Sequence, residues 1–284
     1  MVALESSVFA HGLPAPDNAE AARRMVEALR EQGAEPAILA VVAGTPAAGL
    51  MPDELARFLR GDGVRKASSR DLAGAIADGA DAATTVAGAL ALCRAAGIAV
   101  LVTGGIGGVH REPPFDESAD LLELSRSRVV VICSGAKSVL DLEGTVERLE
   151  SLSIPVVGYR TGEFPGFHFA GTGLPVSARA DDPSGVATLA AAQWRLGHPG
   201  AVLVVQPPPP AAALERSEVE LAIAAALGEA RESGIRGAGT TPFLLGALAR
   251  LTGGRSLATN VALLESNARL GAAVSRALAP HADS

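Results

Sequence analysis

The segment VVVICSGAKS, residues 129–138, decides the class of fold that this chain can adopt. Its first five residues form a continuous apolar run, which is typical of a strand buried on both faces, and Ser134 and Gly135 end that run. The segment IAVLVTGGIGGVH, residues 98–110, repeats this order of an apolar run and a glycine-containing loop. Further apolar runs of the same kind lie at 37–43, 154–159 and 201–205. Short buried strands of this kind form largely parallel sheets that helices cover on both faces.

Helical patterns separate these strands. The periodicity predicts helices at 17–33, 52–60, 70–79 and 84–96, one beyond Lys137, one through Trp194, and three in the last part of the chain. Ser217, Pro242 and Ser256 mark the predicted starts of those three helices. The alternation predicts an α/β fold, a three-layer α-β-α sandwich with a largely parallel central sheet. No charge-rich or low-complexity stretch divides residues 1–284, which predicts a single domain.

Composition argues against several classes of partner. The chain has a net charge of −7 and no basic run, so a nucleic-acid polymer is not an expected partner. No segment approaches the roughly 20 apolar residues that span a bilayer, and the first residues do not resemble a secretion signal, so we expect a soluble cytoplasmic protein without membrane contact. Cys93 and Cys133 lie in apolar segments and are expected to be core residues rather than a disulfide.

Lysine is rare in this chain. Of 24 Lys and Arg residues, only Lys66 and Lys137 are lysine. An amine can lose its proton and attack a carbonyl carbon, whereas a guanidinium stays charged, so the two lysines indicate roles that arginine cannot fill. Alternatively, the two lysines persist by chance at positions that tolerate many residue types. Lys137 follows a predicted buried strand, as expected for an imine-forming amine, and the polar setting of Lys66 suits phosphate or sugar contact.

Two glycine-containing loops are expected on one rim of the sheet. Ligands in such sheets bind at the carboxyl ends of the strands, which predicts that residues 103–110 and 134–137 lie together. The first loop, TGGIGGVH, has neither the Gly-Lys-Ser/Thr ending of a phosphate-binding loop nor the spacing of a dinucleotide-binding loop. A tight turn packed on the sheet explains the glycines as well. His110 ends this loop on the expected ligand rim and is a candidate for substrate contact.

Other segments carry candidate polar groups. Residues 83–86 stand at a predicted helix start, where free N–H groups suit a phosphate, although an ordinary threonine cap explains them equally well. Asp116 and Asp120 are spaced to share a helical face that could hold a divalent cation, and a solvated acidic helix start is the alternative. Glu5 lies between apolar residues, where a carboxyl could have the raised pKa of a general acid.

Two further features concern the walls of the site. Asn260 and Asn267 share one face of the predicted last helix, and a core-facing asparagine is uncommon without a partner. The long segment 160–175 contains aromatic residues and glycines and is a candidate lid or site wall.

These same segments resemble the ordered motifs of the pseudouridine-5'-phosphate glycosidases, also called pseudouridylate synthases. The matching segments follow one another along almost the whole chain, at 3–14, 66–71, 83–86, 103–111, 115–121, 135–141, 163–165, 241–245, 253–257 and 267–269. The resemblance implies an α-β-α sandwich that forms a homotrimer and uses Mn²⁺. It also implies reversible cleavage of the C-C glycosidic bond of pseudouridine 5'-phosphate to uracil and ribose 5-phosphate.

The resemblance assigns roles to individual residues. It implies that Lys137 is the imine-forming nucleophile and that Glu5 is the proton donor, and we expect Asp120 to position the water that hydrolyses the imine. Asp116 is the implied ligand of a single Mn²⁺ ion that is otherwise coordinated largely by water. The implied substrate contacts are Lys66, Thr85, Val86, His110, Ser118 and Asn260.

Three positions depart from the family pattern. Ser69 stands where an arginine is common, Gly162 where an acidic residue is common, and Gln206 where an asparagine often precedes proline. We expect these departures to affect substrate affinity more than the type of reaction. Two other functions stay open: a class I aldolase-like lyase acting on another sugar phosphate, and a sugar-phosphate-binding protein without catalysis.

Overall fold

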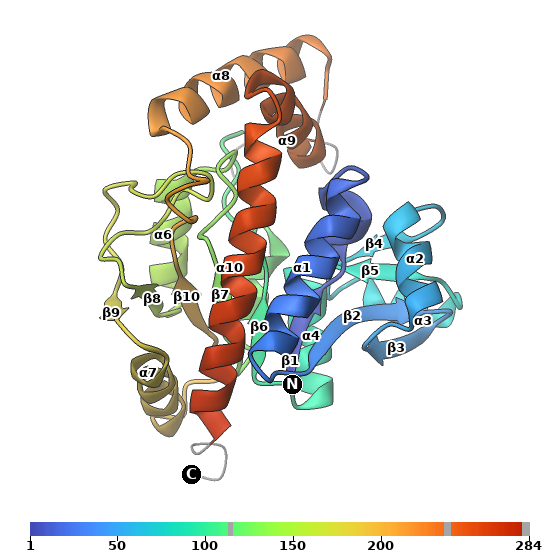
Figure 1. Ribbon diagram of the computed structural model, residues 1–284, viewed down its shortest axis with the longest axis vertical. Coiled ribbons are helices and arrows are strands. Elements are labelled where there is room, and N and C mark those ends of the chain that lie inside the picture. Colours follow the sequence, from blue (N-terminus) through green and yellow to red (C-terminus); the bar gives the residue numbers. More distant parts are fainter. Residues whose placement is uncertain (113–115, 236–239, 280–284) are drawn as a thin grey trace.

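The computed structural model describes residues 1–112, 116–235 and 240–279, so Phe115 of the family motif at 115–121 lies outside the described residues. A ten-stranded sheet forms the centre of the molecule, with helices on both faces (Figure 1). The strands are β1 (Val2–Glu5), β2 (Pro36–Val42), β3 (Thr45–Ala48), β4 (Arg65–Ala67), β5 (Ala82–Thr84), β6 (Val100–Val102), β7 (Val130–Cys133), β8 (Val156–Tyr159), β9 (Ala178–Ala180) and β10 (Val202–Val205).

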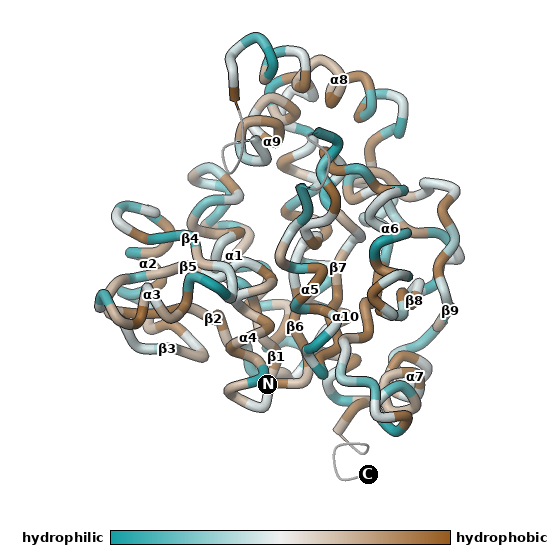
Figure 2. Tube along the Cα trace, turned by 180° about the vertical axis from the view of Figure 1, so that it is seen from behind, coloured by the Kyte–Doolittle hydropathy of each residue, from teal (hydrophilic) through white to brown (hydrophobic). Residues whose placement is uncertain are grey.

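The helices connect these strands and follow the last of them. They are the short π-helix η1 (Val8–Gly12), α1 (Asp17–Glu31), α2 (Pro52–Arg60), α3 (Leu72–Ala77), α4 (Val86–Ala96), α5 (Ala119–Ser125), α6 (Leu142–Ser151), α7 (Pro183–Arg195), α8 (Arg216–Glu232), α9 (Thr240–Leu251) and α10 (Arg255–Leu278). Figures 1 and 2 show from opposite sides that α8 and α9 project at one end, next to the first turns of α10.

The order of the strands places β1, β6 and β7 side by side. The full order is β4-β5-β2-β1-β6-β7-β10-β8-β9, and β3 pairs with β2 beside this path. β1 is parallel to β2 and β6, and β7 is parallel to β6 and β10. β5 is antiparallel to β2, so β4 and β5 run against the central strands. The sheet is therefore largely parallel with one antiparallel margin.

Side chains alternate between the two faces of the sheet and build two hydrophobic layers. Leu101 and Val131 pack in the core that α4 and α6 cover, whereas Val102 and Ile132 pack in the core that α1, α7 and α10 cover. Figure 2 shows mainly apolar residues along the central strands. This arrangement confirms the predicted α-β-α sandwich.

The apolar runs of the sequence are strands, but five other strands were not predicted. The predicted strands at 37–43, 98–103, 129–133, 154–159 and 201–205 correspond to β2, β6, β7, β8 and β10. β1, β3, β4, β5 and β9 were missed because none of them lies in a long apolar run that would mark a buried strand. The predicted helix start at Thr84 was wrong because that residue ends β5, and the helix begins at Val86.

Some predicted helix starts also differ from the structure. Ser217 is not a cap, because α8 begins at Arg216 after Glu215. α9 begins at Thr240, before Pro242, and α10 begins at Arg255, after Gly254 with a φ of 82°. The helix-start signals thus located the helices without fixing their first residues.

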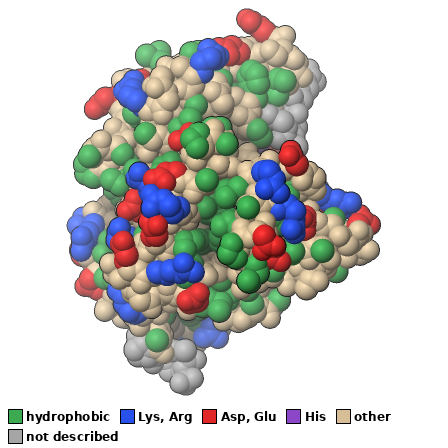
Figure 3. All heavy atoms as spheres, turned by 45° about the vertical axis from the view of Figure 1, so that its right-hand side comes forward, with side chains coloured by type: hydrophobic (Ala, Val, Ile, Leu, Met, Phe, Trp, Pro, Cys, Tyr) green, Lys and Arg blue, Asp and Glu red, His purple; other side chains and the backbone are tan. Residues whose placement is uncertain are grey.

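The surface bears mixed charge. On the face in Figure 3, Lys and Arg side chains lie beside Asp and Glu side chains, in agreement with the many Arg–carboxylate pairs such as Arg23–Glu27. Within the described ranges, no helix is both long and apolar enough to cross a membrane.

Gly271 offers a test of the packing between α10 and the sheet. A Cβ added at Gly271 would lie 2.3 Å from Val102 Cγ2. We expect Gly271→Ala to lower the free energy of unfolding by about 1–3 kcal/mol, because the close-packed core must shift to admit a methyl group.

Gly228→Ala on α8 is the matched control, because no described heavy atom lies within 4 Å of the added Cβ. The higher helix propensity of alanine should make this variant more stable by up to about 1 kcal/mol. Urea denaturation of both variants measures the difference, and equal stabilities would contradict the packing described for α10.

Candidate active site

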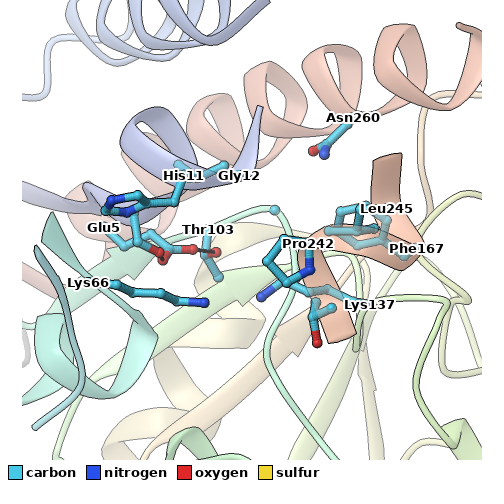
Figure 4. A pocket seen from close by; sticks show the side chains of 15 residues that line it. Glu5, His11, Gly12, Lys66, Thr103, Lys137, Phe167, Pro242, Leu245 and Asn260 are labelled. Atoms are coloured by element: carbon cyan, nitrogen blue, oxygen red, sulfur yellow. Dashed lines mark hydrogen bonds between the residues drawn. The ribbon is translucent and has the colours of Figure 1, made fainter. Parts of the chain in front are cut away.

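Three neighbouring strands bring Glu5, Thr103 and Lys137 to one edge of the sheet. Glu5 ends β1, Thr103 follows β6, and the loop after β7 carries Lys137. Because β1, β6 and β7 are parallel, their carboxyl ends meet at this edge. Figure 4 shows these side chains, together with Lys66, around one pocket.

The Glu5 carboxyl group is buried and is held by two hydroxyl groups. Glu5 is 5% exposed, and Thr103 Oγ1 donates a hydrogen bond to its Oε1 at 2.5 Å. Ser7 Oγ donates to the other oxygen, Oε2, at 3.1 Å. Burial raises the pKa of Glu5, and the positive charge of Lys137 and the bond from Thr103 offset that rise only in part. Glu5 therefore keeps its proton to a higher pH than an exposed glutamate, as a general acid requires.

Backbone contacts fix the loop that carries Lys137. Lys137 N donates to Ile106 O at 3.2 Å, and Ser134 N donates to Gly104 O at 2.8 Å, which joins this loop to the glycine loop after β6. Gly135 has a φ of 86°, and an added Cβ there would lie 2.2 Å from the carbonyl oxygen of Pro165. Glycine is therefore required at position 135 for the backbone to reach Lys137 in this conformation.

Lys66 reaches the same cavity from β4. Burial lowers the pKa of Lys66, the charge of Lys137 lowers it further, and the carboxyl groups of Glu5 and Asp120 oppose this. The only two lysines of the chain therefore lie close enough to repel each other electrostatically. An anionic substrate bound between them would relieve that repulsion.

Asp120 is buried in the first turn of α5 and is held by backbone donors. Its Oδ1 accepts from Ala87 N and its Oδ2 from Gly107 N, each at 2.8 Å. Ser118 caps α5, and its Oγ accepts from Asp120 N at 3.2 Å. A Cβ at Gly107 would lie 2.3 Å from Ser118 Oγ and 2.9 Å from Asp120 Oδ2. The glycine loop thus lets the backbone approach both side chains, which a bulkier residue would displace.

The start of α4 meets a carboxylate of the protein. Thr85 is the N-cap, as the sequence suggested, and its Oγ1 accepts from Gly88 N at 3.4 Å. Ala87 N donates to Asp120 Oδ1, so this end of the helix is already in part occupied by an acid. Thr85 and Val86 line the cavity, where they can still contact a substrate.

Asp116 and Asp120 do not share a helical face, which corrects the prediction from their spacing. α5 begins only at Ala119, so Asp116 belongs to the preceding loop. Its Oδ2 lies 3.6 Å from His110 Nδ1, and its backbone oxygen accepts from His110 N at 2.8 Å. His110 is therefore held beside the Asp116 carboxylate at the wall of the cavity.

The described residues fit a divalent ion only with help from other ligands. No three His, Cys, Asp or Glu side chains among them cluster as a metal site. Asp116 offers one carboxylate that is 39% exposed and faces the cavity. Such a donor suits a hard cation that keeps several waters and also binds a substrate phosphate.

The two asparagines of α10 differ in their surroundings. Asn267 is fully buried, and its Nδ2 donates to Thr103 O at 2.9 Å while its Oδ1 accepts from Gln206 Nε2 at 2.8 Å. Asn260 lines the pocket of Figure 4, and its buried Oδ1 has no hydrogen-bond partner within the described part of the chain. Asn267 thus supports the strand ends, whereas Asn260 remains available to a ligand.

The predicted site residues line two adjoining cavities. The smaller has a volume of about 60 Å³ and the larger of about 610 Å³, and both are bordered by Glu5, Lys66 and Lys137. Asn260 lines the smaller cavity. The larger is also lined by Thr85, Val86, His110, Asp116, Ser118 and Asp120. The structure therefore brings together every residue that the sequence analysis assigned to the site, although their chemical roles stay predictions.

Some residues of the cavity wall were not assigned from the sequence. They are Thr103, His11, Phe167 and Thr241. Thr103 could have been found from its position at the end of a predicted strand on the ligand rim. Phe167 places the segment 160–175 at the site as a wall, which agrees with one of the two roles expected for it.

Two of the three departures from the family pattern take part in structural hydrogen bonds. Burial raises the pKa of Glu123, but hydrogen bonds from Arg126, Arg94 and Ser69 bring it down to about 2. Gln206 donates to Asn267 Oδ1, behind the cavity wall. Gly162 is exposed. The effect of these three residues on substrate affinity stays a prediction.

Comparison with known proteins shows similarity over nearly the whole chain. The model of the family described as "Indigoidine synthase A like protein" matches residues 1–277. A protein of Gemmatimonas aurantiaca named pseudouridine-5'-phosphate glycosidase is 56% identical, over 98% of this chain and 91% of that protein. A protein of the same name from Chloroflexus aurantiacus is 49% identical, over 96% of this chain and 92% of that protein.

Solved structures show the same fold. The prealnumycin C-glycosynthase AlnA in complex with ribulose 5-phosphate has a TM-score of 0.92 and 39% identity, over 100% of this chain and 93% of AlnA. An indigoidine synthase A-like protein from Thermotoga maritima has a TM-score of 0.90 and 38% identity, over 96% of this chain and 91% of that one. The chain therefore belongs to the indigoidine synthase A-like family and, within it, to the pseudouridine-5'-phosphate glycosidases.

Proposed function

We propose that this enzyme reversibly cleaves the C-C glycosidic bond of pseudouridine 5'-phosphate and yields uracil and ribose 5-phosphate. The observation that carries the proposal is the placement of a buried acid, Glu5, and an amine, Lys137, around one cavity, at the ends of the two strands that flank β6. The names of the relatives support this substrate. The complex of AlnA with ribulose 5-phosphate supports the binding of a pentose phosphate by this fold.

A C-C glycosidic bond requires an electron sink that paired carboxylates do not supply. Ordinary glycosidases protonate an oxygen atom of the leaving group, and C5 of uracil carries no such atom. A lysine that has bonded to C1' supplies the sink, because its nitrogen lone pair stabilises the carbon from which uracil departs. Lys137 lies near the buried acid and occupies the lysine position of the family motif at 135–141, so we assign the nucleophilic role to it.

In the first step, the neutral amine of Lys137 bonds to C1' as the ribose ring opens. The C1'–O4' bond breaks, O4' gains a proton and the amine loses one, so the step is balanced. The contacts that fix the Lys137 backbone limit the positions that this amine can reach, which lowers the entropic cost of the attack.

In the second step, Glu5 transfers its proton to C5 of uracil. The C1'–C5 bond breaks, its electron pair restores the C5–C6 double bond, and the nitrogen of Lys137 forms an imine with C1'. Water positioned by Asp120 then adds to C1' and releases ribose 5-phosphate, and the proton set free restores Glu5. The backbone donors on Asp120 keep its carboxylate in place for that water.

The remaining polar groups are proposed to bind the two ends of the substrate. Lys66, His110 and Ser118 border the larger cavity and are assigned to the ribose phosphate, together with the helix start at Thr85 and Val86. Asn260 borders the smaller cavity and is assigned to uracil. We further propose that Asp116 holds one Mn²⁺ ion, whose positive charge would offset that of the phosphate.

Trapping with borohydride tests the imine and separates the rival functions. Wild-type enzyme incubated with ribose 5-phosphate and borohydride should gain the mass of a reduced pentose phosphate, and Lys137→Arg should gain none, because a guanidinium does not form an imine. A binding protein without catalysis would give no adduct. An aldolase-like lyase would give an adduct without releasing uracil from pseudouridine 5'-phosphate. Substantial uracil release by a folded Lys137→Arg variant would overturn the mechanism.

Glu5→Gln tests the proton donor. We expect uracil release to fall about 10²–10⁴-fold, the usual range for loss of a general acid, while the adduct with ribose 5-phosphate still forms. The wild-type rate should also fall as pH rises through the raised pKa of Glu5, because the acid form is the active one, and this limb should be absent in the variant. A variant with an unchanged rate and pH profile would exclude Glu5 as the donor.

Asp116→Asn tests the metal site. We expect weaker binding of Mn²⁺ in the presence of ribose 5-phosphate, measured by calorimetry, because one charged oxygen ligand is lost. Glu117→Gln is the matched control, since the Glu117 carboxylate already pairs with Arg148 at 2.7 Å. Equal affinities of Asp116→Asn and wild type for Mn²⁺ would remove Asp116 as a ligand.

A further inference from the structure

A buried histidine that the proposed mechanism does not use lies next to the loop of Lys137. His168 is 2% exposed, and its Nδ1 lies 2.9 Å from Oγ of Ser138, which is 1% exposed. Ser138 follows the nucleophile directly in the sequence. The two buried side chains therefore join the Lys137 loop to the segment that forms a wall of the site.

The hydrogen bonds of His168 define which nitrogen carries its proton. Burial lowers the pKa of His168 to about 4, so the ring is neutral at neutral pH and has one N–H group. The backbone of Ser256 raises the pKa of His168, as a carbonyl acceptor near the ring does, and the N–H of Ser256 already donates to Thr252 Oγ1. We therefore assign the proton to Nε2, which leaves Nδ1 to accept the hydrogen bond that Ser138 donates.

The backbone around His168 is held on several sides. Phe167 N donates to Ser134 O at 3.1 Å, and Leu214 N donates to His168 O at 2.8 Å. Phe167 has a φ of 66°, which is uncommon for a residue with a side chain, and its ring fills the space beside Gly105. A conformation of this kind persists only where the surrounding contacts enforce it. His168 is therefore fixed in place and can serve as a rigid support for Ser138.

We propose that His168 is a positioning residue that acts through Ser138 to hold Lys137 in its attacking geometry. The link runs from the ring of His168, whose backbone is held by Leu214 N, to the hydroxyl of Ser138. Without it, the Ser138 hydroxyl loses a buried acceptor and the adjoining backbone can shift. This inference rests on the proposed role of Lys137.

Two substitutions of His168 distinguish positioning from simple core packing. Asparagine places an amide oxygen near the position of Nδ1, so His168→Asn can still accept from Ser138. Glutamine reaches the position of Nε2, so His168→Gln keeps the bond to Ser256 and loses the one to Ser138. We expect kcat for uracil release to fall by up to about 10²-fold in His168→Gln with KM little changed, and His168→Asn to restore most of that loss.

Ser138→Ala provides the second arm of the test. We expect it to lower kcat, and the rate at which borohydride traps the ribose 5-phosphate adduct, as much as His168→Gln does. The double variant Ser138→Ala/His168→Gln should lose no more than either single variant, because both break the same link. The midpoint of thermal unfolding of each variant records any loss of fold.

Several results would overturn the role of His168. They are equal losses of kcat in His168→Asn and His168→Gln, additive losses in the double variant, or a wild-type trapping rate in Ser138→Ala. The last result decides the question even if substitutions of His168 prevent folding. The absence of any adduct in wild-type enzyme would instead refute the proposed function itself, so the two failures are distinguishable.

Discussion

The close placement of Glu5 and Lys137 at neighbouring strand ends is the constraint on which the rest of the site depends. The mechanism requires that Glu5 keep its proton and that Lys137 lose one. A Glu5 carboxylate and a Lys137 ammonium would, however, stabilise each other. Burial favours the neutral form of Glu5 more strongly than the charge of Lys137 opposes it. The depth of Glu5 at the end of β1 therefore favours the protonated form of the acid even beside Lys137.

Close backbone approach creates this arrangement. Gly107 leaves room for Ser118 and Asp120, and Gly135 leaves room for the carbonyl of Pro165. The loops after β6 and β7 also exchange backbone hydrogen bonds with each other, which fixes the backbone of Lys137, while the hydroxyl groups of Thr103 and Ser7 hold the Glu5 carboxyl group. A rigid frame of this kind is what orientation of a nucleophile requires.

The sequence was sufficient for the strands with long apolar runs and for naming residues that meet at one site, and insufficient for the other strands, among them β1 at the centre of the sheet. Continuous apolar runs predicted β2, β6, β7, β8 and β10, because strands buried on both faces leave a clear pattern. Thr84 was misplaced in a helix because β5 has only three residues and pairs antiparallel with β2. The spacing of Asp116 and Asp120 misled because Ser118 starts the helix between them. The ring of His168 meets Ser138 only through a tertiary contact over 30 positions of sequence.

The most direct test of the account is to locate the trapped sugar on the chain. Wild-type enzyme treated with ribose 5-phosphate and borohydride would be digested, and its peptides analysed by tandem mass spectrometry. Because Lys66 and Lys137 are the only lysines, the analysis has to distinguish only two possible sites of imine formation on lysine. The account predicts a reduced pentose phosphate on Lys137 alone. Modification of Lys66 in place of Lys137, or of neither lysine, would contradict it.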